Sequence, residues 1–320
     1  MNPFTPFLKK AGVVILDGAL ATELERRGAN LNDPLWSAKM LLEDPSLIQQ
    51  VHLDYLLAGA DVITTASYQA TYEGLQRRGF GPREAEAVFE KSVALACQAR
   101  DVFWAKPANR TGRCKPLVAM SIGPYGAYLA DGSEYSGDYG LSKTELMAFH
   151  QPRLDLLAKT GGDLLAFETI PSLLEAEALV EVLQKMSGQR AWLSFSCRNE
   201  AETSFGDPVE SCIRMADAAA QIVAVGFNCT APEHIGELIK RSAPLTDKPL
   251  LAYPNSGEKW DARHHCWLPG TSQQKLAHNA LEWVKEGASI VGGCCRTGPI
   301  DIAELARLLK SGLTEPIRHS

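Results

Sequence analysis

The chain has 320 residues, of which 45% are hydrophobic and 22% are charged, and its formal net charge is -6. This length and composition suit a globular protein with a core of normal size and argue against extensive disorder. The lysines and arginines are scattered among acidic residues, which argues against nucleic acid as a partner because phosphate binding needs clustered positive charge. No apolar stretch reaches the 18 residues that indicate a membrane span.

The N-terminal region and the cysteines together predict a cytoplasmic protein. The short apolar run Val13–Leu16 is too short for the core of a signal peptide. The eight cysteines are widely spaced and form no Cys-x-x-Cys pair, which disfavours a zinc ribbon or a thioredoxin-type site. In a reducing compartment such cysteines are buried thiols, metal ligands or catalytic groups rather than a disulfide framework.

Eight short aliphatic segments recur along the chain, and each ends in small or polar residues. Their apolarity is continuous rather than alternating, which is typical of strands that are buried on both faces. We predict strands at residues 13–19, 61–68, 117–123, 163–169, 191–197, 222–229, 249–254 and 289–295.

Segments with helical periodicity lie between these strands. In the first of them, for example, Leu47, Ile48, Val51 and Tyr55 share one face. Glycines directly before several predicted strands are typical of helix ends. We predict helices at residues 45–57, 83–102, 144–159, 173–185, 208–220, 232–242, 274–287 and 300–309.

Eight strands that alternate with eight helices predict an α/β fold, the (β/α)8 TIM barrel. A doubly wound parallel sheet is the competing architecture, but its usual ligand signatures, GxGxxG and GxxxxGK[ST], are absent. We expect a single barrel domain over residues 1–320, in which residues 312–320 are a candidate flexible tail. Residues 106–115 are expected to be an exposed loop. Residues 125–140, which include Asp131 and Glu134, form a long segment after a strand and are a candidate active-site lid.

Three thiols stand at predicted strand ends, where a barrel places its chemistry. Cys229 ends one strand, and Cys294 and Cys295 end the last one, after Gly292 and Gly293. The two glycines allow the backbone to turn so that both neighbouring thiols face one centre. Three thiols suit zinc and leave its fourth tetrahedral position open. The more isolated cysteines are instead interpreted as buried apolar residues; they are Cys97, Cys197 and Cys212.

Two carboxylates stand at the same rim. Asp17 follows the first predicted strand and Glu168 the fourth. Either side chain can cap a helix or form an ion pair. At the end of an apolar strand, however, an unpaired carboxylate is costly, and a cationic group of a ligand would resolve that cost.

The rim motifs, in their order along the chain, resemble the homocysteine S-methyltransferase family, and the resemblance runs from about residue 13 to residue 309. The matching motifs are Asp17-Gly18-Ala19, Glu168-Thr169, Gly226-Phe227-Asn228-Cys229 and Gly292-Gly293-Cys294-Cys295. The resemblance implies that Cys229, Cys294 and Cys295 bind Zn²⁺. It also implies that Asp17 and Glu168 hold the amino acid end of homocysteine.

Two further segments, 121–135 and 253–258, are similar to the branch of this family that uses S-methylmethionine, with S-adenosylmethionine as a second donor. The expected reaction moves a methyl group from such a sulfonium to the thiol of homocysteine and gives methionine. A free thiol is mostly protonated at neutral pH, and binding to zinc deprotonates it. Aromatic faces that can stabilise the sulfonium are those of Tyr68, Tyr125, Tyr128 and Trp260.

Several alternatives remain open from the sequence. The methyl donor can be betaine. Alternatively, the thiols can form a purely structural zinc site, for which His264, His265 or Cys266 would supply the fourth ligand. The thiols can also bind no metal and act as a redox sensor. A Schiff-base or phosphate-handling barrel is disfavoured because no predicted strand end presents a lysine. A folate donor is disfavoured because the chain has no room for the additional domains that it would need. The sequence does not indicate the oligomeric state.

Overall fold

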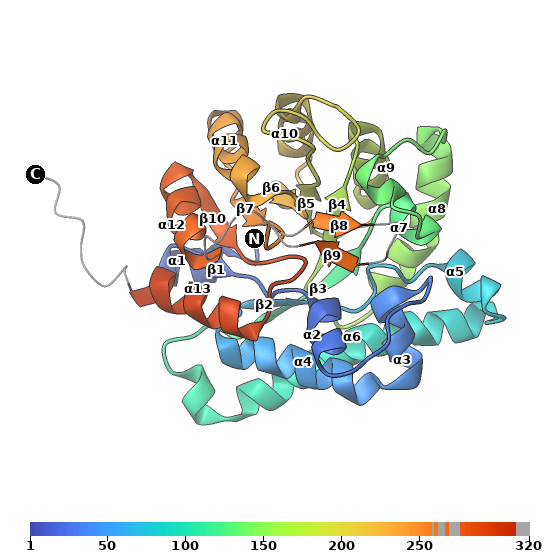
Figure 1. Ribbon diagram of the computed structural model, residues 1–320, viewed down its shortest axis with the longest axis horizontal. Helices are drawn as coiled ribbons and strands as arrows, with labels where there is room; N and C mark the ends of the chain where they lie inside the picture. Colours follow the sequence, from blue (N-terminus) through green and yellow to red (C-terminus); the bar gives the residue numbers. More distant parts are fainter. Residues whose placement is uncertain (258, 262–265, 269–275, 312–320) are drawn as a thin grey trace, which may run out of the picture.

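The computed structural model describes residues 1–257, 259–261, 266–268 and 276–311, and it shows eight parallel strands in a nearly closed barrel surrounded by helices (Figure 1). The barrel strands, in chain order, are β1 (Val14–Ile15), β2 (Val62–Thr64), β3 (Leu117–Ile122), β4 (Leu164–Ile170), β5 (Ala191–Phe195), β6 (Ile222–Asn228), β7 (Leu250–Tyr253) and β10 (Ala288–Val291). The predicted TIM barrel is therefore confirmed.

The barrel closes between its first two strands. The sheet order is β1-β10-β7-β6-β5-β4-β3-β2, so neighbours in space are neighbours in sequence around the ring. An isolated parallel bridge joins Leu16 to Val62, and the backbone of Asp61 donates to Ile15 over 2.7 Å. A doubly wound sheet would instead leave two open edges, so that alternative is wrong.

All eight predicted strands are present. No strand extends more than one residue beyond its predicted bounds, and several are shorter than predicted. The shortening is greatest where polar residues follow the apolar run, because those residues leave the hydrogen-bonded ladder and line the rim. The eight predicted helices are also present, as α4 (Pro45–Ala58), α6 (Pro82–Ala105), α8 (Lys143–Leu157), α9 (Leu173–Gln184), α10 (Val209–Ala218), α11 (Pro232–Ser242), α12 (Leu276–Glu286) and α13 (Pro299–Ser311).

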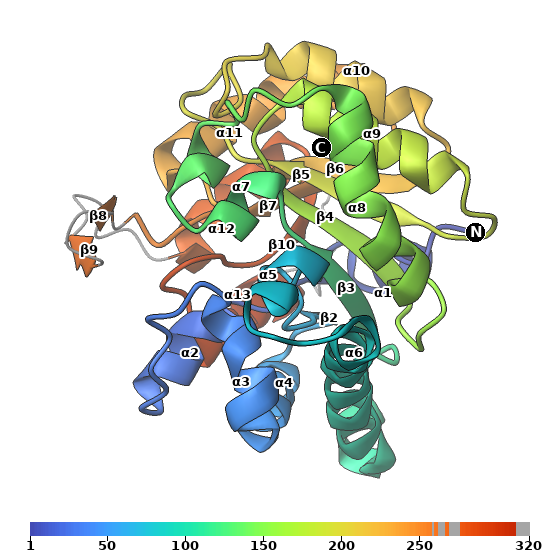
Figure 2. The same ribbon diagram turned by 90° about the vertical axis from the view of Figure 1, so that its right-hand side faces the viewer.

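The structure adds short elements that the sequence did not predict. These are the helices α1 (Thr5–Ala11), α2 (Leu20–Arg26), α3 (Met40–Glu43), α5 (Tyr72–Arg77) and α7 (Tyr125–Leu129), the 3-10 turns η1 (Trp36–Lys39), η2 (Pro107–Arg110), η3 (Ser133–Tyr135) and η4 (Ala243–Leu245), and the antiparallel strands β8 (Lys259–Asp261) and β9 (Cys266–Leu268). None of the helices spans three full turns, so periodicity is a weak signal for them. In Figure 2 the β8–β9 pair projects away from the barrel, and α1 lies at the opposite end.

Side chains fill the barrel, which is a packed core and not a pore. Trp192 is fully buried inside it. The ring of Phe4, just before α1, lies 6.3 Å from the Trp192 ring and covers the end of the barrel at which the strands begin. Trp192 Nε1 donates to the Tyr253 hydroxyl over 3.0 Å. This bond links the packed interior to the polar rim above it.

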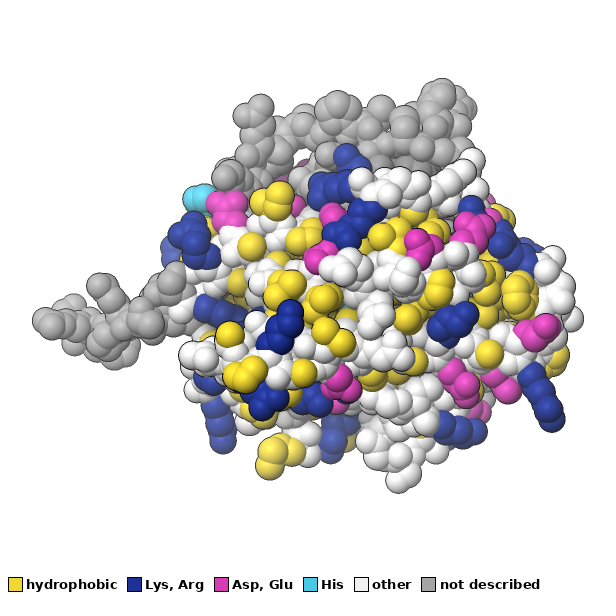
Figure 3. Space-filling view, turned by 90° about the horizontal axis from the view of Figure 1, so that it is seen from below, with side chains coloured by type: hydrophobic (Ala, Val, Ile, Leu, Met, Phe, Trp, Pro, Cys, Tyr) yellow, Lys and Arg dark blue, Asp and Glu magenta, His cyan; other side chains and the backbone are white. Residues whose placement is uncertain are grey.

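Two features of the described chain concern membranes and nucleic acids as partners. None of the described helices combines the length and the apolarity that a membrane span requires. On the face seen in Figure 3, basic side chains are interspersed with acidic and apolar ones rather than gathered into one patch. A phosphate backbone would find no continuous basic stripe on this face.

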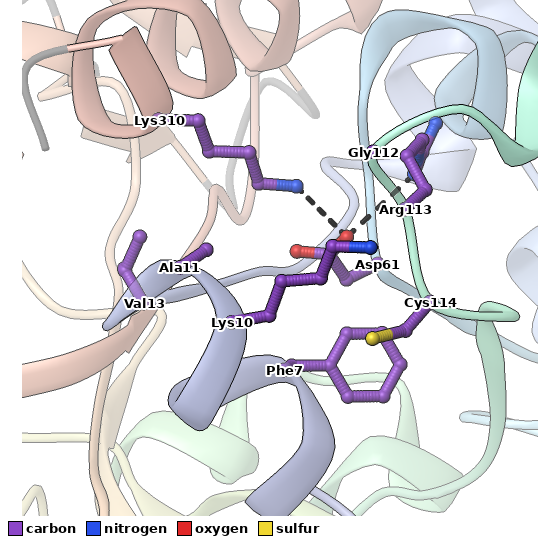
Figure 4. Close-up of a pocket in the computed structure, with 9 residues that line it drawn as sticks. All are labelled: Phe7, Lys10, Ala11, Val13, Asp61, Gly112, Arg113, Cys114 and Lys310. Carbon is purple, nitrogen blue, oxygen red and sulfur yellow. Dashed lines mark hydrogen bonds and ion pairs between the residues drawn. The ribbon is translucent and has the colours of Figure 1, made fainter. Parts of the chain in front are cut away.

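A buried ion cluster joins helices and strands at the end of the barrel where the strands begin (Figure 4). Asp61 accepts from the backbone of Ile15 over 3.0 Å and from Lys310 Nζ over 2.8 Å, and Arg113 lies 3.7 Å from the same carboxylate. Arg113 and Lys310 also donate to carbonyls at the end of α4, those of Leu56, Gly59 and Ala60. The two cations thus cap α4 and tie it to α13 and to the segment before β3, and their hydrogen bonds serve the fold.

Replacing Asp61 with asparagine leaves Lys310 and Arg113 without an anionic partner in a half-buried position. We expect the free energy of unfolding to fall by about 2–4 kcal/mol, because removal of one partner of a buried ion pair leaves the other uncompensated. Urea denaturation measures this change. The control is Asp101→Asn, because the Asp101 side chain is 59% exposed in its pairs with Arg100 and Lys115. This substitution should cost less than about 1 kcal/mol. Equal losses in the two variants would contradict a structural role for the buried cluster.

Candidate functional site

Three cysteine thiols converge at the C-terminal rim of the barrel. Cys229 directly follows β6, and Cys294 and Cys295 lie three and four residues after β10. The Sγ atom of Cys229 is 3.1 Å from that of Cys294 and 3.7 Å from that of Cys295, and all three lie within 4.8 Å of one another. Among the described residues, this is the one group of three or more Cys, His, Asp or Glu side chains close enough to share a metal ion.

The sulfur spacing fits a metal centre better than a disulfide. Ligands about 2.3 Å from a tetrahedral zinc lie about 3.8 Å from one another, close to the separations found here. A disulfide requires about 2.05 Å, which is shorter than either of the measured distances. The three thiols therefore form a donor set that can bind a thiophilic metal.

The backbone at these strand ends adopts conformations that non-glycine residues rarely take. Cys229 has a φ of 49°, Thr169 of 63° and Arg296 of 68°, all in the left-handed region. Each such residue costs on the order of 1–3 kcal/mol, and residues of this kind cluster at functional sites. At Cys229 the left-handed conformation ends β6 and turns the chain at the thiol.

Gly292 lets the last strand approach the end of the first, and Gly293 makes room for the turn that follows β10. A side chain at Gly292 would collide with Leu16 and with the carbonyl of Asp17, and one at Gly293 would collide with Thr297. The chain then turns, and Thr297 Oγ1 donates to the carbonyl of Cys294 over 2.6 Å. These contacts give a steric reason for the Gly-Gly pair that precedes the two cysteines.

Hydrogen bonds from the neighbouring thiols lower the pKa of Cys229 well below its ordinary value in the metal-free protein. The Tyr135 hydroxyl lies 3.5 Å from the same sulfur. The pKa values of Cys294 and Cys295 are raised instead, so Cys229 is the thiol of the three that ionises most readily.

The two predicted carboxylates lie at the same rim and are buried. Asp17 accepts hydrogen bonds from the backbone nitrogen of Thr64 over 2.7 Å and from its hydroxyl. Glu168 accepts from the hydroxyl of Ser121 and, over 3.2 Å, from that of Tyr253. No lysine or arginine in the described part of the chain forms an ion pair with either carboxylate.

Burial raises the pKa of Asp17 to about 8, and the negative charge of Glu168 adds to that effect. Burial likewise raises the pKa of Glu168 to about 7, against the hydrogen bonds from Ser121 and Tyr253. Two carboxylates that share a buried site without a cation are held back from ionising. A positively charged ligand group placed beside them would reverse the effect and be bound in return.

A polar network beneath the rim was not predicted from the sequence. Asn228 Oδ1 accepts from the backbone of Thr169 over 2.7 Å and from Ser194 Oγ over 2.9 Å. Ser194 also bonds to the Tyr253 hydroxyl, which donates to Glu168. The network fixes the ends of β4, β6 and β7 against one another. Its signal in the sequence was a serine inside an otherwise apolar strand, as Ser194 is in β5.

The candidate lid is ordered and not an irregular loop. It contains α7 and η3, and a side chain at Gly126 would collide with the backbone of Ser133 and Glu134, so the two turns pack directly on each other. The backbone of Tyr125 donates to Glu175 over 2.6 Å. Periodicity did not reveal these elements because each is only three to five residues long.

A buried network supports the start of the lid. His150 Nε2 lies 2.8 Å from Glu175, and Arg153 contacts both His150 Nδ1, over 2.6 Å, and the carbonyl of Gly123. Burial, with the charge of Arg153, lowers the pKa of His150 to about 4, so this histidine is neutral at physiological pH. The network is structural and holds the connection between β3 and α7.

The aromatic residues expected to face a sulfonium separate into distinct groups. Burial raises the pKa of Tyr68 well above the ordinary value, and the charges of Glu134 and Cys229 add to that effect. Tyr68 is therefore near the thiols. Tyr125 and Tyr128 pack against Phe149 instead, and the guanidinium of Arg77 lies 4.5 Å from the centre of the Tyr128 ring. That cation already covers one face of Tyr128, so the expectation is weakened for this residue.

The remaining predictions fall into two groups. Cys197 and Cys212 are buried and Cys97 is partly buried, in keeping with their interpretation as apolar residues. His264 and His265 lie outside the described residues, as do 312–320, and for Cys266 and Trp260 only the backbone in β9 and β8 is described.

Comparison with known proteins gives a consistent result. The family described as homocysteine S-methyltransferase matches residues 14–309. The chain is 49% identical to "Homocysteine S-methyltransferase YbgG" of Bacillus subtilis, over 97% of this chain and 99% of that protein. It is 46% identical to a selenocysteine Se-methyltransferase of Brassica oleracea var. italica, over 94% and 90%. The crystal structure of the metallated form of the homocysteine methyltransferase MmuM from Escherichia coli superposes with a TM-score of 0.86 at 45% identity, covering 95% of this chain and 99% of that one.

The raised pKa of Asp17 predicts a pH dependence of stability in the metal-free protein. The folded state prefers the protonated carboxyl, so its stabilising contribution is complete below about pH 4 and is lost as pH rises towards about 8. Asp17→Asn cannot ionise and should lose less stability than the wild type between pH 5 and pH 8. Urea denaturation of both proteins at the two pH values measures the difference. Identical losses would show that Asp17 ionises freely.

Proposed function

Since the chain belongs to the homocysteine S-methyltransferase family, we propose that it moves a methyl group from a sulfonium, S-methylmethionine, to the thiol of L-homocysteine, with zinc held by Cys229, Cys294 and Cys295. The observation that carries the proposal is the pairing of three clustered thiols with two buried carboxylates that lack a cation, all at one rim. S-adenosylmethionine is a second sulfonium donor of the same chemistry.

The three cysteines supply the soft donor set that zinc prefers, and they leave a tetrahedral ion one position short. Zinc bound there would lower the pKa of the acceptor thiol so that it is a thiolate at neutral pH. The protein contributes the arrangement. Cys229 is fixed by its left-handed backbone, and Cys294 is fixed by the hydrogen bond from Thr297 to its carbonyl.

Asp17 and Glu168 are proposed to bind the ammonium group of homocysteine. Both are buried and both already accept hydrogen bonds that orient their oxygens, Asp17 from Thr64 and Glu168 from Ser121 and Tyr253. An ammonium between them would neutralise part of the repulsion that raises their pKa values. The acceptor would then be anchored at one end by its ammonium, with its sulfur free to point to the thiol cluster.

The transfer itself needs little acid–base chemistry from the side chains. A bond forms between the homocysteine sulfur and the methyl carbon, while the bond from that carbon to the sulfonium sulfur breaks and its electron pair stays on the donor. The thiol proton has already gone to solvent, and the leaving group is a neutral thioether, so no acid is needed. What remains for the protein is alignment of the two sulfur atoms and the methyl carbon and exclusion of water, which the rim network and lid provide.

The proposal includes the setting of the reaction. One domain over residues 1–320 contains all the proposed groups, and a cytoplasmic location would keep the three thiols reduced.

The test is a donor comparison with the zinc-loaded protein. Homocysteine is incubated with S-methylmethionine, S-adenosylmethionine, betaine or methyltetrahydrofolate in turn, and the methionine formed is measured. We expect the highest kcat/KM with S-methylmethionine. A higher value with betaine would contradict the proposed donor, and no methionine from any donor would favour a structural or redox role for the thiols.

Each of the three rim cysteines should be required for zinc binding. Cys229→Ala, Cys294→Ala and Cys295→Ala remove one thiolate each, and we expect every one to lose most of its zinc and at least about 100-fold in activity. Metal analysis of the purified variants measures the loss. Cys97→Ala and Cys212→Ala are matched controls that should keep both metal and activity. Full zinc occupancy in Cys295→Ala would remove that residue from the site.

Glu168→Gln should raise the KM for homocysteine by about tenfold or more and leave the zinc content unchanged, because the amide keeps the shape but loses the charge that attracts the ammonium. Steady-state kinetics and metal analysis give the two readings. The control is Glu181→Gln on α9, where the carboxylate pairs with Lys143 at the surface. Unaltered homocysteine kinetics in Glu168→Gln would assign Glu168 a structural role.

A further inference from the structure

We infer that Glu134, in the lid turn η3, binds the positive sulfonium of the methyl donor, a role that rests on the proposed function. The rim carboxylates Asp17 and Glu168 then bind the acceptor, and a separate carboxylate in the lid binds the donor. Glu134 is thus proposed as a determinant of donor specificity.

The position of Glu134 carries the inference. Its neighbour Tyr135 reaches the metal-binding cluster, with its hydroxyl 3.5 Å from Cys229 Sγ. The Glu134 carboxylate is near enough to interact electrostatically with Cys229, Cys295 and Tyr68. Its Oε2 atom is buried and has no hydrogen-bond partner within the described structure. A buried acceptor without a donor is expensive, and a cationic ligand beside it would remove that cost.

Glu134 comes from a different element than the two rim carboxylates, because it lies in η3, whereas Asp17 follows β1 and Glu168 lies in β4. The charges of both Glu134 and Glu168 act on the hydroxyl of Tyr68, so the two carboxylates belong to one site. The donor must reach the acceptor sulfur from the side that the acceptor and the thiols leave free. The sulfonium, which carries the transferred methyl, is the part of the donor nearest the thiol cluster. A lid carboxylate near Cys229 and Cys295 is therefore placed for the sulfonium.

The other acid of the lid has a different environment. Asp131 is exposed, and its carboxylate already accepts from the backbone and the hydroxyl of Ser133. From the sequence, both acids belong to the same candidate lid, residues 125–140. The structure separates them, because Asp131 closes a local turn whereas Glu134 turns inward.

Glu134 is held in place before any ligand binds. The close packing of Gly126 against its backbone fixes η3 on α7, and the bond from Tyr125 to Glu175 fixes the start of α7. Burial is the main cause that raises the pKa of Glu134 to about 7, and the charge of Cys229 adds to it. A buried carboxylate is costly to ionise without a cation beside it, so a positively charged ligand group would be bound favourably at this point.

The charge balance of the reaction predicts a distinctive kinetic signature. The sulfonium is fully positive in the bound donor, partly neutralised in the transition state and neutral in the product thioether. A carboxylate beside it stabilises the bound donor more than the transition state, so it lowers KM without raising kcat. The carboxylate does not attract the neutral sulfur of the product, and this favours release of methionine.

The experiment compares Glu134→Gln with Asp131→Asn in the zinc-loaded full-length protein. For Glu134→Gln we expect the KM for S-methylmethionine to rise by about tenfold or more, with kcat equal to or higher than that of the wild type. The homocysteine KM, the inhibition constant of methionine and the zinc content should each stay within about twofold. Asp131→Asn should match the wild type in all five quantities. Thermal unfolding of both variants confirms that each is folded.

Two outcomes overturn the inference. An unchanged donor KM in Glu134→Gln contradicts it alone, provided that the wild type consumes S-methylmethionine. A kcat lower than that of the wild type contradicts it as well, at any donor KM, because it would assign Glu134 to the transition state. If the wild type does not consume S-methylmethionine, the proposed donor fails first and the inference fails with it.

Discussion

Convergence of two distant strand ends on one point is the constraint on which the rest of the site depends. Cys229 and the Cys294–Cys295 pair are about 65 residues apart in the chain, yet their sulfur atoms are 3.1 Å and 3.7 Å apart. Parallel strands in a closed barrel present all their C-terminal ends at the same rim, so the fold supplies this proximity at no extra cost. The left-handed conformation at Cys229 and the close approach at Gly292 are local distortions that turn proximity into a usable donor set.

Negative charge without a matching protein cation is the second organising feature. The described site contains Asp17, Glu168 and Glu134 together with thiols, and the three carboxyls all have pKa values raised mainly by burial. A protein of ordinary stability tolerates such an arrangement only where function requires it. In the proposed reaction, the missing positive charges are those of the metal, the ammonium of the acceptor and the sulfonium of the donor. Each of these three groups would then supply a cation to a site whose described residues carry only acidic groups.

The sequence was sufficient for the architecture and for the residues at the ends of buried strands. Continuous apolar runs predict these strands well, because a strand that is buried on both faces has apolar residues at nearly every position. The same logic located Asp17 and Glu168, whose carboxylates interrupt apolar runs at the rim. The pattern of side chains along one strand, however, carries no information about which residues of other strands they will meet.

Residues that act through contacts between distant elements were accordingly missed or misjudged. Tyr253 supports Glu168 from β7, and Asn228 joins β6 to Thr169, but both pairings depend on the register of neighbouring strands. The lid shows the same limit. Asp131 and Glu134 are three residues apart and chemically alike, so the sequence treats them as equivalent. Packing of Gly126 against η3 decides that one is exposed and the other is directed inward.

In the proposed reaction, three protein thiols form an open metal site that accepts the sulfur of the substrate. X-ray absorption spectroscopy at the zinc edge, with and without homocysteine, tests it most directly because it counts the sulfur neighbours of the metal. We expect three sulfur neighbours in the zinc-loaded protein and four after homocysteine is added. Four protein ligands before homocysteine and no change after it would exclude the open site, because a closed site has no place for the acceptor.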